Sequence, residues 1–192
     1  MPLVATWRGF AAFGIVMLAF LVQEFCQGFG TPSDSARRDD RWALIYLDAL
    51  PVALVTISLA LSLVGWLALP MSALVFVIGI GVLVLGIAFR QWSHVSLGRF
   101  HQGVVTIHDE HEVIEHGPYR WVRHPMYASS AIAFLGVGLA LGTYPGLVIT
   151  SLGTLPAMLR RINVEERALE SALGQRYTSF ASTRRRLIPG IW

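Results

Sequence analysis

Residues 71–89 read MSALVFVIGIGVLVLGIAF, an apolar run that contains no charged side chain. A bilayer core about 30 Å thick is crossed by about 20 apolar residues in a helix, and this run meets that length. The composition of the 192-residue chain agrees, because 54% of its residues are hydrophobic and only 14% are charged, unlike a typical soluble domain. The run therefore predicts a membrane-spanning helix.

Four further apolar runs lie on either side of this one, at residues 7–29, 43–69, 126–141 and 145–159. Pro70 separates the second run from residues 71–89, so these two are expected to form a tight helical hairpin. The last two runs are near the lower length limit for a span. The chain is therefore expected to be an all-α integral membrane protein with about five transmembrane helices. Its polar C-terminal residues are expected to be largely helical, with Gly174 capping a helix.

The basic residues predict an orientation in the membrane. All fifteen are Arg, and with five spans fourteen of them fall on one side, while only Arg8 falls on the other. Because cytoplasmic loops are enriched in basic residues, the N-terminus is predicted outside and the C-terminus in the cytosol. No cleavable signal is expected. The net charge of +3 is modest and spread along the chain, so nucleic acid is not an expected partner.

A polar tract at residues 111–127, HEVIEHGPYRWVRHPMY, ends where the fourth apolar run begins. Gly117 and Pro118 predict a sharp turn that leaves backbone amides open to a ligand. Arg123 stands just before Pro125, a residue suited to the first turn of a helix, and this combination favours an anion site fit for a carboxylate. An interfacial anchor for a helix end explains the Arg and Tyr residues singly, but not the ordered run.

A second polar cluster, RINVEER at residues 161–167, follows the last apolar run. Arg161 and Glu165 are four residues apart and could pair on a helix surface. Glu166 shares a helix face with Asn163 and Leu169, so it is the better candidate for an inward-facing acid. The predicted orientation places this cluster on the same side as residues 111–127, which supports a shared site. Two other carboxylates fall at the boundary of this side, and solvated helix ends explain them equally well: Glu24 and Asp48.

A metal site is not expected. His108 and His111 have i, i+3 spacing, but the nearby His, Asp and Glu residues fit no recognised ligand pattern. The single Cys26 excludes an intrachain disulfide and a multi-Cys metal site. Gly138 and Gly142 have GxxxG spacing, for which helix packing inside a monomer is favoured over a dimer seam.

The two polar clusters together resemble the isoprenylcysteine carboxyl methyltransferases, and the related phospholipid N-methyltransferases share much of the pattern. The matching positions are H-x-V-I-x-x-G-P-Y-x-x-x-R-H-P-x-Y at 111–127, R-I-x-x-E-E-x-x-L-x-x-x-L-G-x-x-Y at 161–177 and LIPG at 187–190. The resemblance covers about residues 90–189, and the earlier spans match only in number and hydrophobicity. Glu115, His116 and Leu173 depart from the usual pattern, without removing a proposed catalytic group.

The resemblance implies a membrane enzyme that uses S-adenosylmethionine, bound in a cytosolic pocket of the C-terminal half. Residues 1–89 would form three N-terminal transmembrane helices, and residues 90–192 a catalytic half with two more and a cytosolic C-terminal helix. Arg123 and Glu166 would be catalytic. The positions implied to bind the cofactor are His111, Val113, Ile114, Gly117, Pro118, Tyr119, His124, Tyr127 and Glu165.

The acceptor remains open between two kinds of chemistry. A carboxylate is already nucleophilic and needs only orientation, which Arg123 could supply, whereas an amine must lose a proton, which Glu166 or His124 could take. The membrane setting predicts a lipophilic or lipidated acceptor, most simply the carboxylate of a prenylcysteine-like molecule. The alternatives are methylation of a phospholipid or another small amine or thiol, a non-catalytic membrane protein that binds a metal or haem through His residues, and a reductase of the sterol-reductase type.

Overall fold

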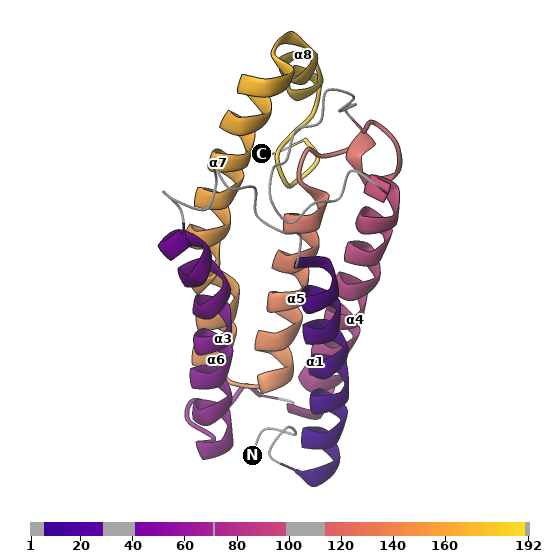
Figure 1. The fold of residues 1–192 in the computed structure, drawn as a ribbon. Coiled ribbons are helices and arrows are strands. Elements are labelled where there is room, and N and C mark those ends of the chain that lie inside the picture. The colour runs from indigo at the N-terminus through magenta and orange to yellow at the C-terminus, as the bar shows by residue number, and fades with distance from the viewer. Residues whose placement is uncertain (1–5, 29–40, 71, 99–113, 191–192) are drawn as a thin grey trace.

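The computed structural model describes residues 6–28, 41–70, 72–98 and 114–190, which form an elongated bundle of helices (Figure 1). The helices of the bundle run roughly along its long axis, and the C-terminal helices extend beyond one end of it. Among the described residues there is no named strand, and only two isolated β-bridges occur. The helices in chain order are α1 (Trp7–Gly28), α3 (Arg41–Val64), α4 (Ser72–Leu97), α5 (Pro125–Leu141), α6 (Tyr144–Gly153), α7 (Leu155–Leu173) and α8 (Gln175–Thr183), with the 3-10 helix η3 (Gly117–Arg120) before α5.

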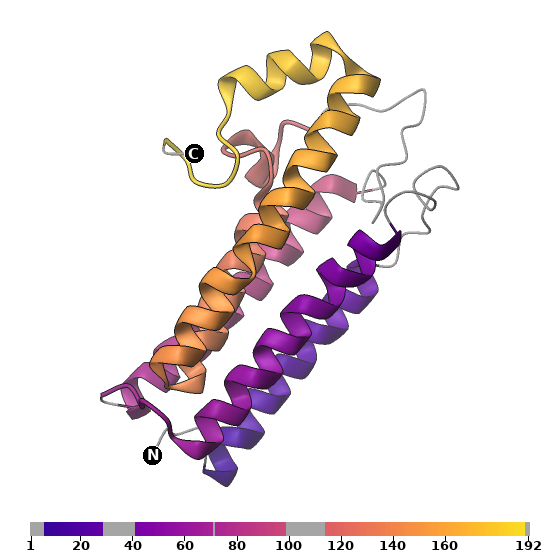
Figure 2. The same ribbon diagram turned by 90° about the vertical axis from the view of Figure 1, so that its left-hand side faces the viewer.

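α4 and α5 pack along each other, and glycines make this contact possible. A Cβ on Gly79 or Gly86 of α4 would overlap the α5 backbone, and one on Gly136 of α5 would overlap the backbone at Leu83. α1 packs on α4 and α3 packs on α6, so α1 and α3 form an outer layer over α4, α5 and α6 (Figure 2). The buried core contains Phe13 and Phe20 of α1 together with residues of α4 and α5. Gly138 lies against α6, so it serves packing within the chain, as predicted, whereas Gly142 ends α5 in a left-handed conformation (φ 69°).

The second and third apolar runs end elsewhere than predicted. α3 ends at Val64 rather than at residue 69, because Gly65 (φ 72°) and Leu67 (φ 50°) adopt left-handed conformations that a helix cannot continue. α4 continues to Leu97, beyond the predicted end at residue 89. Its extension buries Arg90 and Ser93, and Arg90 Nη1 donates to Ser130 Oγ of α5 at 2.9 Å. The apolar run ends at the first charged residue, Arg90, but the helix continues past it.

The predicted fifth span at 145–159 is divided between two helices. α6 ends at Gly153, and α7 begins at Leu155 with Pro156 in its first turn, where the missing N–H costs no helical hydrogen bond. α7 then continues through the second polar cluster, so residues 161–167 belong to the same helix as the end of the apolar run. Gly174 ends α7 in a positive-φ conformation (φ 52°), as predicted for a cap.

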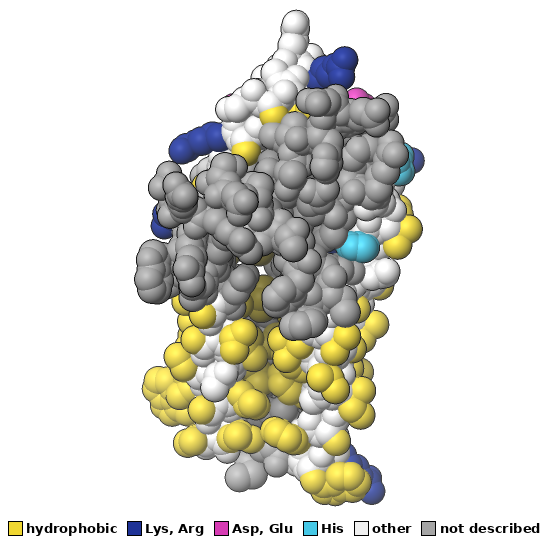
Figure 3. Space-filling view, viewed as in Figure 1, with side chains coloured by type: hydrophobic (Ala, Val, Ile, Leu, Met, Phe, Trp, Pro, Cys, Tyr) yellow, Lys and Arg dark blue, Asp and Glu magenta, His cyan; other side chains and the backbone are white. Residues whose placement is uncertain are grey.

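Length and composition single out one described helical stretch, Ala73–Leu97, as long and apolar enough to cross a membrane. Shorter apolar stretches lie in α1, α3 and α5, at Trp7–Gln23, Ala49–Val64 and Pro125–Leu141. Many large apolar side chains of these helices are exposed, and Figure 3 shows them gathered over the part of the bundle away from α8. The all-helical prediction is confirmed, whereas the number of membrane spans stays a prediction.

Candidate functional site

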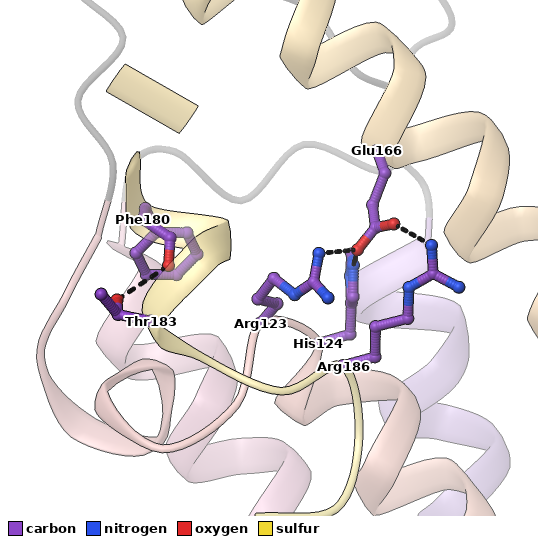
Figure 4. A network of polar contacts seen from close by, with 6 residues as sticks. All are labelled: Arg123, His124, Glu166, Phe180, Thr183 and Arg186. Carbon is purple, nitrogen blue, oxygen red and sulfur yellow. Dashed lines mark hydrogen bonds and ion pairs between the residues drawn. The ribbon is translucent and has the colours of Figure 1, made fainter. Parts of the chain in front are cut away.

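Glu166 is at the centre of a polar network with Arg123, His124 and Arg186 (Figure 4). Its side chain is only 6% exposed, and it extends from α7 toward the two residues that precede α5. Glu166 Oε1 lies 2.7 Å from Arg123 Nη1 and 3.1 Å from His124 Nε2. The structure thus joins the two sequence clusters, and it confirms that Glu166 is the inward-facing acid of its pair.

Arg186, which the sequence analysis did not select, completes this network. Arg186 Nη2 lies 2.7 Å from Glu166 Oε2, so the two oxygens of the carboxylate are held by different groups. The C-terminal segment runs alongside the residues before α5: the Arg123 amide donates to the Arg185 carbonyl at 2.8 Å, and the His124 amide to the Arg186 carbonyl at 3.0 Å. Farther along, Arg184 Nη2 lies 2.7 Å from Glu115 Oε2. The end of the chain therefore forms part of the site.

The protonation state of Glu166 follows from these contacts. Burial alone would raise the pKa of the carboxyl, but the hydrogen bond from His124 and the charge of Arg123 outweigh burial and lower the pKa below its usual value of 4.5. The hydrogen bond from Arg186 acts in the same direction. Glu166 is thus a carboxylate at neutral pH, and it is a weak base.

Glu165, the neighbour of Glu166, takes part in a second chain of contacts. The Tyr127 hydroxyl donates to Glu165 Oε2 at 2.8 Å and accepts a hydrogen bond from Arg161 Nε at 3.1 Å. Tyr127 stands in the first turn of α5, one turn from His124, and their rings are 5.8 Å apart. Glu166 thus contacts His124 immediately before α5, and Glu165 contacts Tyr127 in the first turn of α5.

The Gly117–Pro118 turn that the sequence predicts is the start of η3. Gly117 has φ 59°, and a Cβ there would overlap the Ser96 side chain at the end of α4. Pro118 and Tyr119 are buried, and Trp121 contacts Trp92 of α4 with ring centroids 5.5 Å apart. The turn is consequently packed down onto α4, which places Tyr119 in the field of both Glu165 and Arg90.

Two buried polar groups of the site, Arg123 Nε and the Tyr177 hydroxyl, form no hydrogen bond of good geometry with a described residue, but a weaker hydrogen bond joins the Tyr177 and Arg123 side chains. Tyr177 is 3% exposed, and it lies close enough to Glu166 and Arg123 for both charges to influence its pKa. A buried donor without a partner typically costs about 1–3 kcal/mol.

The remaining predicted positions are placed only in part. Ile114 is partly buried at the start of a described segment, whereas His111 and Val113 lie outside the described residues, as do the side chains of Glu24 and Asp48. Within the described part of the chain, no three His, Cys, Asp or Glu side chains come together as metal ligands. Three of the six histidines (His101, His108 and His111) lie outside the described residues.

Comparison with known proteins assigns the family. Residues 74–176, which include both polar clusters, match the phospholipid methyltransferase family model. The chain belongs to this family. The chain is also 31% identical over 106 residues to a probable protein-S-isoprenylcysteine O-methyltransferase of Oryza sativa subsp. indica. The matched residues make up 54% of this chain and 56% of that relative. It is 30% identical over 103 residues to the protein-S-isoprenylcysteine O-methyltransferase of Schizosaccharomyces pombe, covering 53% and 44%.

This member of the phospholipid methyltransferase family spans about half the length of the curated relatives it matches. An uncharacterised Bacillus subtilis protein, YpbQ, is 28% identical over 94 residues, which cover 48% of this chain and 56% of YpbQ. Among solved structures, a eukaryotic intramembrane Ras methyltransferase (isoprenylcysteine carboxyl methyltransferase) superposes with a TM-score of 0.66 at 22% identity. That superposition covers 96% of this chain and 67% of the other, and it shows that the helical fold is shared.

Proposed function

We propose that this chain transfers a methyl group from S-adenosylmethionine to the carboxylate of a lipophilic, prenylcysteine-like acceptor. The observation that carries the proposal is the state of Arg123. Glu166 Oε1 holds its Nη1 at 2.7 Å, while its buried Nε has no well-formed hydrogen bond to a described residue. Because a guanidinium presents its donors in a fixed fork, anchoring one edge leaves the other aimed at a ligand carboxylate.

Glu166 acts as a positioning residue in this proposal. A carboxylate with a lowered pKa, held by Arg123, His124 and Arg186, is poorly suited to removing a proton from an ammonium group. It is well suited to fixing the guanidinium of Arg123. A carboxylate acceptor needs no base, so the geometry favours the first of the two chemistries that the sequence left open.

The residues around Tyr127 have the chemistry to hold the cofactor. S-adenosylmethionine supplies an activated methyl group on a sulfonium, and it also carries an ammonium and ribose hydroxyls. Tyr119, Tyr127 and the Glu165 carboxylate offer aromatic faces and a negative charge to such cationic groups. Gly117, Pro118, Ile114 and His124 would line the same region, together with His111 and Val113. The pocket is proposed to lie in the C-terminal half, residues 90–192, beside the three N-terminal spans of residues 1–89.

The apolar surface of the bundle supports a membrane setting and a lipophilic acceptor. Figure 3 shows exposed hydrophobic side chains over the part of the bundle away from α8, whereas Glu166 stands in the half of α7 that is nearer to α8 in the chain. The count of arginines supports an N-terminus outside and a site in the cytosol. Two relatives are named as protein-S-isoprenylcysteine O-methyltransferases, one of them as probable, and the solved structure with the same fold is a Ras methyltransferase. These names support an acceptor that bears a prenyl group and a free carboxylate.

Methylation of a phospholipid amine is the second candidate, because the family model that matches residues 74–176 is named for it. A labelled-methyl assay that offers an S-prenylated cysteine, phosphatidylethanolamine and a small thiol side by side separates the two. We expect the label in the prenylcysteine. Label in phosphatidylethanolamine or the thiol, with none in the prenylcysteine, would overturn the proposal.

A further inference from the structure

A groove on the surface of α4 and α5 has no part in the proposed methyl transfer. Its volume is about 310 Å³. It is lined by apolar and aromatic side chains of the two helices: Leu85, Ala88, Phe89 and Trp92 of α4 and Ile132 of α5. The α4 residues recur at intervals of three and four, so they form one face of that helix. Leu85 is 59% exposed and Trp92 is 46% exposed, so this face is open to the surroundings of the bundle.

A series of aromatic contacts leads from the groove to a cation. The ring centroids of Phe89 and Trp92 are 6.1 Å apart, and those of Trp92 and Trp121 are 5.5 Å apart. Trp121 directly follows η3, which contacts α4 and ends at Arg120 (Figure 1). The Arg120 guanidinium lies 4.6 Å from the centroid of the Trp121 ring. Arg120 is exposed and forms no ion pair with a described residue, so its charge is available to a ligand.

This combination has the chemistry of a site for a phospholipid with a negative headgroup. An apolar groove can hold part of an acyl chain, tryptophans favour the membrane–water interface, and a guanidinium binds phosphate oxygens. The position agrees, because Trp92 lies toward the C-terminal end of Ala73–Leu97, the stretch that is long and apolar enough to cross a membrane. The predicted orientation puts this end on the cytosolic side, where the leaflet carries anionic lipids.

We propose that the groove and Arg120 bind an anionic phospholipid that is not the methyl acceptor. One acyl chain lies along the groove beside Phe89 and Trp92, and the phosphate accepts hydrogen bonds from the Arg120 guanidinium. The groove is lined by α4 and α5 alone, whereas the network of Glu166 also includes α7 and the C-terminal segment. Because Arg120 belongs to η3, the bound lipid would stabilise η3 on α4. The inference uses the membrane setting of the proposed function, but not its methyl transfer.

Native mass spectrometry of the full-length, detergent-solubilised protein tests the charge recognition. Phosphatidylglycerol and phosphatidylcholine with identical acyl chains are titrated in parallel. We expect phosphatidylglycerol to bind about fivefold more tightly, which is the effect of one basic residue near a membrane surface. Arg120→Gln should remove this preference, whereas Arg176→Gln, at an exposed position of α8, should keep it. Equal affinities for the two lipids in the wild-type protein, or an equal loss in the two variants, would overturn the proposal.

A second pair of variants tests the groove. Ala88→Trp fills it, and Ala73→Trp makes the same change at an exposed position near the other end of α4. Ala88→Trp should weaken phosphatidylglycerol binding about tenfold, which corresponds to roughly two methylene groups that lose their burial. Ala73→Trp should not weaken it, and equal affinities in the two variants would contradict the proposed place of the acyl chain. The thermal unfolding midpoint shows that each variant is folded.

Competition separates the phospholipid from the proposed methyl acceptor. An S-prenylated cysteine added in excess should leave phosphatidylglycerol bound to the wild-type protein. Its displacement would assign the groove to the acceptor and overturn the proposal. Because the binding measurements need no methyl transfer, they decide the role of the groove even if the proposed function fails.

Discussion

Arg186 and Glu166 form an ion pair of 2.7 Å that connects the C-terminal segment to α7. The same carboxylate holds Arg123 through its other oxygen. Arg186 therefore influences the geometry of Arg123 through the carboxylate that both side chains contact. This relationship makes the end of the chain part of the proposed catalytic machinery rather than an appendage to it.

Arg186→Gln is expected to lower kcat/KM about tenfold, because Glu166 loses one of its two cationic partners and holds Arg123 less firmly. The pKa of Glu166 should rise, so the acid limb of the pH–rate profile should move to higher pH. Arg185→Gln removes the same charge from the neighbouring, exposed position and should leave both measurements unchanged. An equal loss in the two variants would mean that only the net charge of the segment matters.

The lowered pKa of Glu166 should also make the stability of the wild-type protein depend on pH. Glu166 has a lower pKa in the folded protein than in the unfolded chain, so its contribution is fully present above the usual carboxyl pKa of 4.5. That contribution is lost as the pH falls through the lowered value. Unfolding midpoints measured from pH 7 to pH 3 should fall at the acid end, and the fall should be smaller in Glu166→Gln. Identical pH dependence in the two proteins would contradict this account of Glu166.

Arg123→Ala and Glu166→Ala are each expected to abolish methyl transfer while leaving the protein folded. Breaking a buried, multiply bonded ion pair costs about 3 kcal/mol, which is less than the stability of a typical domain. Glu170→Ala is the matched control, because Glu170 is exposed on the same helix as Glu166. Near-normal turnover in either of the two site variants would remove that residue from the mechanism.

Glu165→Gln should weaken the binding of S-adenosylhomocysteine about tenfold, because the Tyr127 hydroxyl loses a charged acceptor and the cofactor loses a negative neighbour. Calorimetry on the folded protein measures this directly. Glu170→Gln serves as the comparison on the same helix. An unchanged affinity of Glu165→Gln for S-adenosylhomocysteine would show that the cofactor does not bind beside Glu165.

Gly117→Ala tests the packing of η3 on α4. Gly98→Ala is its control, since Gly98 has a similar positive φ (55° against 59°) but open space where a Cβ would stand. A positive φ alone costs an L-residue about 1–2 kcal/mol, so Gly98→Ala should show only that loss. Gly117→Ala should lose more stability, together with cofactor affinity, because its Cβ overlaps Ser96. Equal losses of stability in Gly117→Ala and Gly98→Ala would show that η3 can shift away from Ser96 without cost.

The sequence predicts the parts of this molecule that depend on local chemistry. Long apolar runs predict α1, α4 and α5, the Arg-His-Pro order predicts the start of α5, and the shared helix face predicts that Glu166 points inward. The end of α4 is missed, because a helix continues past Arg90 when another helix buries that side chain. The break between α6 and α7 is missed, although Pro156 marks it in the sequence.

Arg186 and Tyr177 could not be selected from the sequence, because their roles depend on a contact between distant segments. Arg186 is one of three consecutive arginines, and nothing local distinguishes it from Arg184 or Arg185. Only the parallel course of the C-terminal segment beside Arg123 and His124 brings it to Glu166. Tyr177 stands at a position of the recognised pattern, but the pattern does not say that its side chain is buried beside Arg123.

The central claim is that the methyl group is transferred to a carboxylate oxygen, and the stability of the product in base tests it most directly. A methyl ester releases its methyl group as volatile methanol in mild base, whereas N-methyl and S-methyl products retain it. The purified protein is incubated with methyl-labelled S-adenosylmethionine and an S-prenylated cysteine, and the extracted product is treated with base. We predict that the label becomes volatile and that Arg123→Ala yields none. Label that stays in the extracted product after treatment would contradict the proposed chemistry.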